Sequence, residues 1–122
     1  MYELTVDAHF DAAHCLDGYN GECANVHGHT WLVSATVRTE ELDDIGMSVD
    51  FKIVRQSLEW AVGIFDHTVL NNLDLFANSN PTAENLSRII FERLSERLKS
   101  YRADVVAITV GEGSRNRLTY RP

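Results

Sequence analysis

A thiol and two imidazoles lie close together in the segment Cys23-Ala24-Asn25-Val26-His27-Gly28-His29. The chain has only two Cys and five His, so this clustering needs an explanation. Alternating apolar and polar residues from 27 to 37 predict a strand, and side chains two residues apart on a strand point to the same face. His27 and His29 are therefore predicted to lie side by side, where together they can bind one metal ion.

A third imidazole strengthens this hypothesis, since a His-x-His pair alone is more often part of a core than a metal site. His14 follows a strand-like run that ends at Phe10, and a hairpin of the first two strands would return it to the base of the pair. Three neutral imidazoles suit a tetrahedral zinc ion whose fourth position is left for water or substrate. The alternative for His14 is a loop residue with no ligand role.

Cys23 has two incompatible interpretations. It is either the fourth ligand of a closed zinc site with one Cys and three His, or a thiolate that acts as base or nucleophile beside the metal. Asp66-His67 is a further candidate for proton transfer, because a carboxylate can fix the tautomer of an imidazole and raise its basicity. The simpler interpretation of this dipeptide is a capping or surface pair at the end of a helix.

Two glutamates and the charge balance bear on the ligand. Glu112, between two glycines, can accept paired hydrogen bonds from an amidine-like edge, or it is only a polar turn residue. Glu84 has an adequate structural role at the positive end of a helix.

The net charge of −7 argues against a general nucleic-acid or anionic-membrane surface. An anionic small substrate would need a local basic patch, and Arg115, Arg117 and Arg121 are the densest group.

The elements that position these residues can be followed along the chain. Periodicity predicts strands over 2–10, 27–37, Val105–Val110 and Leu118–Tyr120, and amphipathic helices from about Asp50 and from Asn80-Pro81 to Lys99-Ser100. Asn is a favoured N-cap, and Pro fits the first helical position. The order strand, strand, helix, helix, strand, strand predicts an α+β fold: a four-stranded antiparallel sheet with both helices on one face.

Residues 1–122 are predicted to form one globular domain, because the chain has no repeat, linker or low-complexity run. No secretion signal or membrane span is recognisable, so we expect a cytoplasmic protein with both Cys reduced. The short sheet has open edges, and pairing them with copies of the same chain would give a symmetric oligomer.

Taken together, the motifs resemble those of the 6-pyruvoyl-tetrahydropterin synthase superfamily, most closely its 6-carboxy-5,6,7,8-tetrahydropterin synthase branch in queuosine biosynthesis. The resemblance spans nearly the whole chain. The motifs that carry it, in the family's order, are Phe10-Asp11-Ala12-Ala13-His14, Cys23-xxx-His27-Gly28-His29, Val49-Asp50-Phe51, Asp66-His67 with Leu70-Asn71, Asn80-Pro81-Thr82-Ala83-Glu84-Asn85 and Glu112. The short interval between Cys23 and His27 resembles the carboxy-forming branch, since the pyruvoyl-forming synthases typically have a longer one.

The resemblance implies a role for each of these residues. It implies that zinc is bound by His14, His27 and His29, that protons are moved by Cys23 with Asp66 and His67, that the pterin ring is anchored by Glu112, and that the pterin pocket is lined by Glu84 and Thr82. It also implies the tunnelling fold (T-fold), in which trimers close a barrel, two trimers stack into a homohexamer and each active site lies between subunits.

The reaction implied by the resemblance converts 7,8-dihydroneopterin triphosphate to 6-carboxy-5,6,7,8-tetrahydropterin, with release of acetaldehyde and triphosphate. Lys52, Arg55 and Arg115 are the candidates for the cationic patch that a triphosphate requires. One departure concerns Glu112: the family often has Glu-Thr at this motif, whereas Gly113 follows here, so the local turn should differ.

Three alternatives stay open. A sister pterin enzyme, such as a 6-pyruvoyl-tetrahydropterin synthase or a dihydroneopterin side-chain lyase, would share the metal and the pocket but release another product. A non-catalytic zinc- or pterin-binding module would use Cys23 to close the site. A cupin-like metal protein would also contain His-x-His, but two amphipathic helices and the lack of a Glu soon after His29 count against it.

Overall fold

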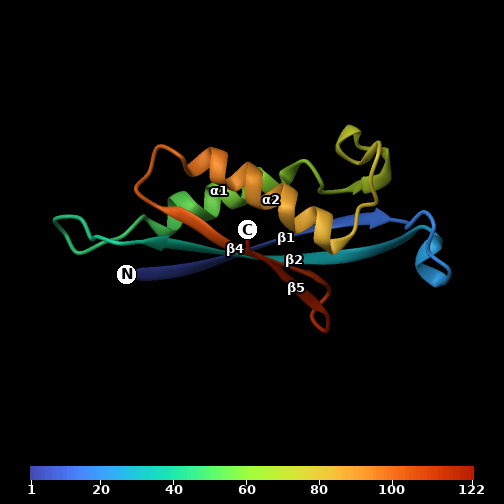
Figure 1. The fold of residues 1–122 in the computed structure, drawn as a ribbon, viewed down its shortest axis with the longest axis horizontal. Helices are drawn as coiled ribbons and strands as arrows, with labels where there is room; N and C mark the ends of the chain where they lie inside the picture. The colour runs from blue at the N-terminus through green and yellow to red at the C-terminus, as the bar shows by residue number, and fades with distance from the viewer.

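The computed structural model covers residues 1–122 and shows a twisted sheet with two helices on one face (Figure 1). The elements in chain order are β1 (Tyr2–His14), β2 (His27–Thr39), α1 (Phe51–Gly63), β3 (Thr68–Val69), α2 (Ala83–Leu98), β4 (Asp104–Glu112) and β5 (Arg117–Tyr120). Short 3-10 helices occur at Glu22–Ala24, Leu70–Asn72 and Asp74–Phe76. The α+β class and the order of the two helices and four main strands are as predicted.

The sheet has five strands in the order β3-β1-β2-β4-β5, so the prediction of a four-stranded antiparallel sheet was wrong in two respects. The extra strand, β3, has two residues, and it pairs with β1 in parallel. Two residues are too few for a periodic pattern. Because β3 pairs only with Ala12 and Ala13, the rest of that β1 edge has no strand partner within the chain.

The β1–β2 hairpin is longer than its periodicity predicted. β1 runs past Phe10 to His14, because every residue from Tyr2 to His14 has an antiparallel partner on β2. The register places His14 opposite His27, and Ala12 opposite His29. His14 therefore lies at the base of the His pair, as predicted, but it belongs to the strand and not to the loop after it.

The two helices begin with side-chain caps. Asp50 caps α1 by accepting a hydrogen bond from the backbone N–H of Lys52 at 2.8 Å. The predicted cap of α2 was wrong by two residues, since Thr82 accepts from the N–H of Asn85 at 3.1 Å and the helix begins at Ala83. Asn80 is not the cap because its side chain pairs with the backbone of Asp17. Pro81 consequently lies just before the helix.

Both helices pack on the same face of the sheet and bury a single core cluster of 23 residues. Phe10 and Trp31 stack with ring centroids 5.9 Å apart, and Phe65 lies 5.4 Å from Phe10. This aromatic group adjoins the end of the hairpin that carries the three His. Neither helix is long and apolar enough to cross a membrane.

Candidate metal centre and active site

Three imidazoles converge where β1 ends and β2 begins. His14 is buried on the helix-facing side of β1, and His27 and His29 lie on the same side of β2 because they are two residues apart. The ring centroids of His14 lie 4.5 Å from His27 and 5.2 Å from His29, and the latter two are 4.9 Å apart. One ring nitrogen of each His lies within 4.8 Å of the others.

The hydrogen bonds around these rings determine which nitrogen is free. The Nδ1 of His14 lies 2.7 Å from the carbonyl oxygen of Pro81, and the Nδ1 of His27 lies 2.7 Å from that of Asn25. Because a carbonyl can only accept, both Nδ1 atoms carry the proton and both Nε2 atoms present a lone pair. The Nε2 atoms of all three His are buried and have no hydrogen-bond partner. Three unpartnered Nε2 atoms facing one another fit a zinc ion with three His ligands.

Burial also keeps two of these imidazoles neutral. Loss of solvent lowers the pKa of His14, although the hydrogen bond to Pro81 opposes the shift, and nearby His27 lowers it further. Burial lowers the pKa of His29 as well, against the opposing charge of Glu112. A neutral imidazole is the form that binds a metal, so the site is prepared for a cation at neutral pH.

These pKa shifts predict how the stability of the metal-free protein depends on pH. On unfolding, the pKa values of His14 and His29 return toward the ordinary value of 6.5. Below that pH the unfolded chain therefore binds more protons than the folded chain. The free energy of unfolding should therefore fall as the pH drops below 6.5. Urea unfolding in the presence of EDTA, at a series of pH values above and below 6.5, measures how the free energy of unfolding depends on pH. The double variant H14N/H29N should show a weaker dependence. A protein equally stable on both sides of this pH would contradict the prediction.

Trp31 forms the inner wall of the cluster, a role that sequence reasoning missed. Its ring lies 4.9 Å from that of His14 and 5.2 Å from that of His29, edge to face, and it is fully buried. Its indole N–H donates to the carbonyl oxygen of Ala12 at 3.2 Å, which fixes the ring. The sequence already indicated this position, because Trp31 follows His29 by two residues and therefore lies on the same face of the strand as His27 and His29.

Cys23 lies in the β1–β2 loop, in the 3-10 helix Glu22–Ala24. Its side chain is half-buried and forms no disulfide. Its thiol is not part of the cluster in which the three imidazoles come within 4.8 Å of one another. In a closed tetrahedral site, bonds of about 2.0–2.3 Å would place the sulfur within about 4 Å of every ligating nitrogen. The structure therefore does not bring the Cys23 thiol into the ligand cluster as a fourth member.

Asp66 and His67 form a second cluster, with Asp11 and apart from the three imidazoles. Asp66 Oδ2 lies 3.0 Å from His67 Nδ1, and Asp66 Oδ1 accepts from the N–H of Asp11 at 3.0 Å. That N–H and His67 together lower the pKa of the Asp66 carboxyl. His67 has a φ of 57°, a rare conformation for a side-chain-bearing residue, and its own N–H donates to the carbonyl of Asp11 at 2.6 Å. The pair is an oriented carboxylate and imidazole, exposed at the edge of β1.

The two clusters lie on different sides of the hairpin. His14 faces the helices, whereas Asp11 is exposed on the other face, where the hydroxyl of Thr30 donates to its carboxylate at 2.6 Å. Within one chain, therefore, the structure does not bring Asp66 and His67 to the imidazole cluster.

The predicted ligand-contacting residues are divided between the two ends of the molecule. Glu112, at the end of β4, reaches to 3.6 Å from the Nε2 of His29. Thr82 and Glu84 lie at the start of α2, next to the Pro81 carbonyl that holds His14, but the Thr82 hydroxyl already caps the helix. Among the cationic candidates, Arg115 follows Glu112 in the β4–β5 turn, whereas Lys52 and Arg55 lie in the first turns of α1, beyond the other end of β2.

Gly113 allows the turn after Glu112 to form. Its φ of 81° lies in the left-handed region that glycine adopts without strain, and its N–H donates to the carbonyl of Thr30 at 3.1 Å. A threonine in this conformation would be strained, which explains why the turn suits Gly here. The turn returns the chain as β5 along β4, while Glu112 itself lies opposite Trp31 because β4 pairs with β2.

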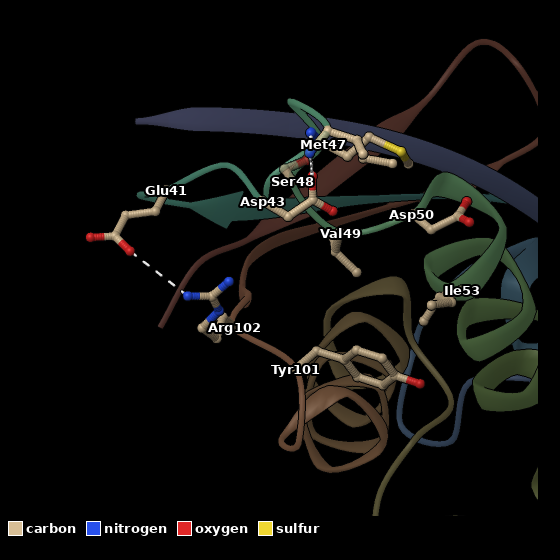
Figure 2. A pocket seen from close by; sticks show the side chains of 10 residues that line it. Glu41, Asp43, Met47, Ser48, Val49, Asp50, Ile53, Tyr101 and Arg102 are labelled. Atoms are coloured by element: carbon tan, nitrogen blue, oxygen red, sulfur yellow. Dashed lines mark hydrogen bonds and ion pairs between the residues drawn. The ribbon is translucent and has the colours of Figure 1, made fainter.

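A cavity of about 390 Å³ lies elsewhere, between the β2–α1 connection and the loop after α2 (Figure 2). Val49, Ile53 and Tyr101 contribute to its lining, as do Arg102 and Glu41, which pair at 3.8 Å. It contains none of the imidazoles or the predicted substrate residues. The candidate site is accordingly the loop end of the β1–β2 hairpin, where His14 lies opposite His27, and not this cavity.

The fold and the three-imidazole cluster define a class of small α+β proteins with three His, able to hold a metal ion, at the end of a β-hairpin. The chain belongs to the 6-pyruvoyl tetrahydropterin synthase family, whose model matches residues 3–122.

The chain is also similar to individual proteins that carry a name. The chain is 33% identical to a 6-carboxy-5,6,7,8-tetrahydropterin synthase of Bacillus subtilis, over 99% of this chain and 86% of that protein. It is 31% identical to the protein of that name from Synechocystis, over 79% and 77% of the two chains. The solved structure of 6-pyruvoyl tetrahydropterin synthase from Caenorhabditis elegans superposes with a TM-score of 0.85 at 24% identity, covering 99% and 95%. That superposition supports the shared fold.

Proposed function

We propose that this protein is a zinc-dependent lyase that converts 7,8-dihydroneopterin triphosphate to 6-carboxy-5,6,7,8-tetrahydropterin, releasing acetaldehyde and triphosphate. The proposed setting is queuosine biosynthesis in the cytoplasm. The observation that carries the proposal is the set of three buried, unpartnered Nε2 atoms with a free thiol outside the set. The names of the relatives support the choice of reaction.

His14, His27 and His29 are the proposed zinc ligands. A zinc ion bound there would polarise the oxygens of the substrate side chain as a Lewis acid. The protein's own contribution is to hold the ligands: Pro81 and Asn25 fix two of the rings through Nδ1, and Trp31 blocks movement toward the core. The rings therefore need little reorganisation to bind the ion.

Cys23 and the Asp66–His67 pair are the proposed proton carriers. The Asp66 carboxylate, 3.0 Å from His67 Nδ1, would fix the tautomer of that imidazole and stabilise its protonated form, leaving Nε2 to exchange a proton with substrate. Cys23 would exchange a proton with substrate from the β1–β2 loop, outside the ligand cluster. Because the two clusters are apart within one chain, we propose that the second carrier comes from a neighbouring subunit of a homohexamer.

Glu112 is the proposed anchor of the pterin ring. Its carboxylate is one-third exposed, so it can accept paired hydrogen bonds from the N–H groups of a pterin edge while pointing toward His29. Thr82 and Glu84 are proposed to line the same pocket, and Arg115 to meet the triphosphate from the β4–β5 turn.

Product analysis tests this proposal. Zinc-loaded protein is incubated with 7,8-dihydroneopterin triphosphate and the products are identified by mass spectrometry. We expect 6-carboxy-5,6,7,8-tetrahydropterin and an equal amount of acetaldehyde, with about one zinc ion per chain. A pyruvoyl product would instead identify the sister synthase, and no turnover by fully loaded protein would favour a binding module.

A further inference from the structure

The loop that carries Cys23 is held by the segment Cys15–Asp17, which follows β1 and enters a turn at Asp17. The backbone N–H of Leu16 donates to the carbonyl oxygen of Cys23 at 2.9 Å. Leu16 thus bonds to Cys23, whereas the N–H and C=O groups of Cys15 and Asp17 are bound from outside the loop.

Two asparagine side chains bind those outward groups, each through both ends of its amide. Asn71 accepts from the N–H of Cys15 and donates to its carbonyl oxygen, both at 2.9 Å. Asn80 accepts from the N–H of Asp17 at 3.0 Å and donates to its carbonyl oxygen at 2.9 Å. A side-chain amide presents a donor and an acceptor as a peptide group does, so each asparagine binds its residue as a neighbouring peptide group would.

Both asparagines stand on well-anchored backbone. Asn71 follows Leu70, which is fully buried in the core. Asn80 lies before α2, and its own carbonyl accepts from the side chain of Asn85 at 2.8 Å and from the N–H of Thr82 at 2.9 Å. The segment Cys15–Asp17 is thus fixed to the frame formed by the core and the start of α2.

We propose that Asn71 and Asn80 are positioning residues that hold the loop carrying the Cys23 thiol, acting through the backbone of Cys15–Asp17. The inference rests on the proposed function, since it assumes that the place of the thiol matters for turnover. Neither asparagine needs to touch substrate. Their effect should appear as altered exposure of Cys23 and reduced kcat, with little change in KM.

Asparagine-to-aspartate variants test the proposal in the full-length, zinc-loaded protein. N71D and N80D preserve shape and the acceptor, but each places a carboxylate oxygen against a carbonyl oxygen where the amide donated. N72D is the matched control, since Asn72 is exposed and adjacent and the variant has the same change of charge. All variants carry C15S, which leaves the backbone contacts of residue 15 in place and makes Cys23 the only thiol.

The readouts are the rate of Cys23 alkylation by iodoacetamide, kcat, KM and zinc content. Losing one such pair of contacts should raise the alkylation rate and lower kcat, each about tenfold, while KM changes less than about threefold. Zinc content should stay at the level of N72D. Folding is checked by circular dichroism, and N80D provides an independent test should N71D fail to fold.

Alkylation rates and kcat equal to those of N72D in both variants would overturn the proposal. Loss of zinc together with activity in N71D would also overturn it, because Asn71 would then serve His14 and not Cys23. Normal turnover by C23A would instead refute the catalytic role of the thiol, and the alkylation rates would still show whether the asparagines hold the loop.

Discussion

Replacing Cys23 with Ala should lower kcat by about 10²–10⁴-fold while zinc content stays unchanged. The expected loss is that of a general acid or base, because the proposed thiol exchanges a proton directly with substrate. Zinc should be retained because the thiol lies outside the cluster of His14, His27 and His29, whose Nε2 atoms have no hydrogen-bond partner in the protein. The measurements are steady-state turnover and metal content by mass spectrometry.

The matched control is C15S, which removes the other free thiol without touching the proposed carrier. It should keep its zinc and most of its activity. The outcome that would contradict the catalytic role is loss of zinc in the Cys23 variant to the same extent as in H27N. In that case Cys23 would be a zinc ligand, and zinc bound to the unaltered protein would protect its thiol fully from alkylation, as expected for a closed site of one Cys and three His.

Mixing two inactive variants should restore activity. Neither C23A nor H67A should turn over substrate alone, but co-expressed chains should regain about a quarter of normal activity if assembly is random and each site takes the thiol from one subunit and His67 from another. The reason is geometric: the clusters containing His14 and His67 are separate within one chain. Turnover per site in the purified mixed protein provides the measurement.

A mixture of C23A with H27N is the control, since the proposed site takes the thiol and the zinc ligands from the same subunit. It should recover much less activity than the pair that includes H67A, because no neighbouring subunit could supply the missing group from the other cluster. Failure of C23A and H67A to complement in a verified mixed oligomer would show that both residues act from the same chain. A monomeric protein with full activity would lead to the same conclusion.

Local sequence patterns determined most of the elements of this protein. The alternation along β1 and β2 placed His27 and His29 on one face, and the helical spacing after Asp50 identified α1. These inferences succeed because side-chain direction follows from the period of the backbone, two residues in a strand and about 3.6 in a helix. The same local reasoning failed at Asn80, where the residue type suited a helix cap but its side chain had a partner elsewhere.

Long-range pairing could only be decided by the tertiary structure. The parallel pairing of β3 with β1, the register that brings His14 opposite His27, and the separation of Asp66 and His67 from the imidazoles all depend on residues far apart in the sequence. No period of one segment encodes the partner of another, because packing and register select it.

Asn71 and Asn80 illustrate this division. The sequence shows two asparagines in family motifs, and by itself it offers capping and turn roles for such residues. Each binds a backbone group more than 50 residues away, at Cys15 and Asp17. The residue types that could bind metal and move protons were thus readable from the sequence. The placement of those groups was decided by the folded backbone, whose polar groups must be satisfied by whatever donor or acceptor packing brings near.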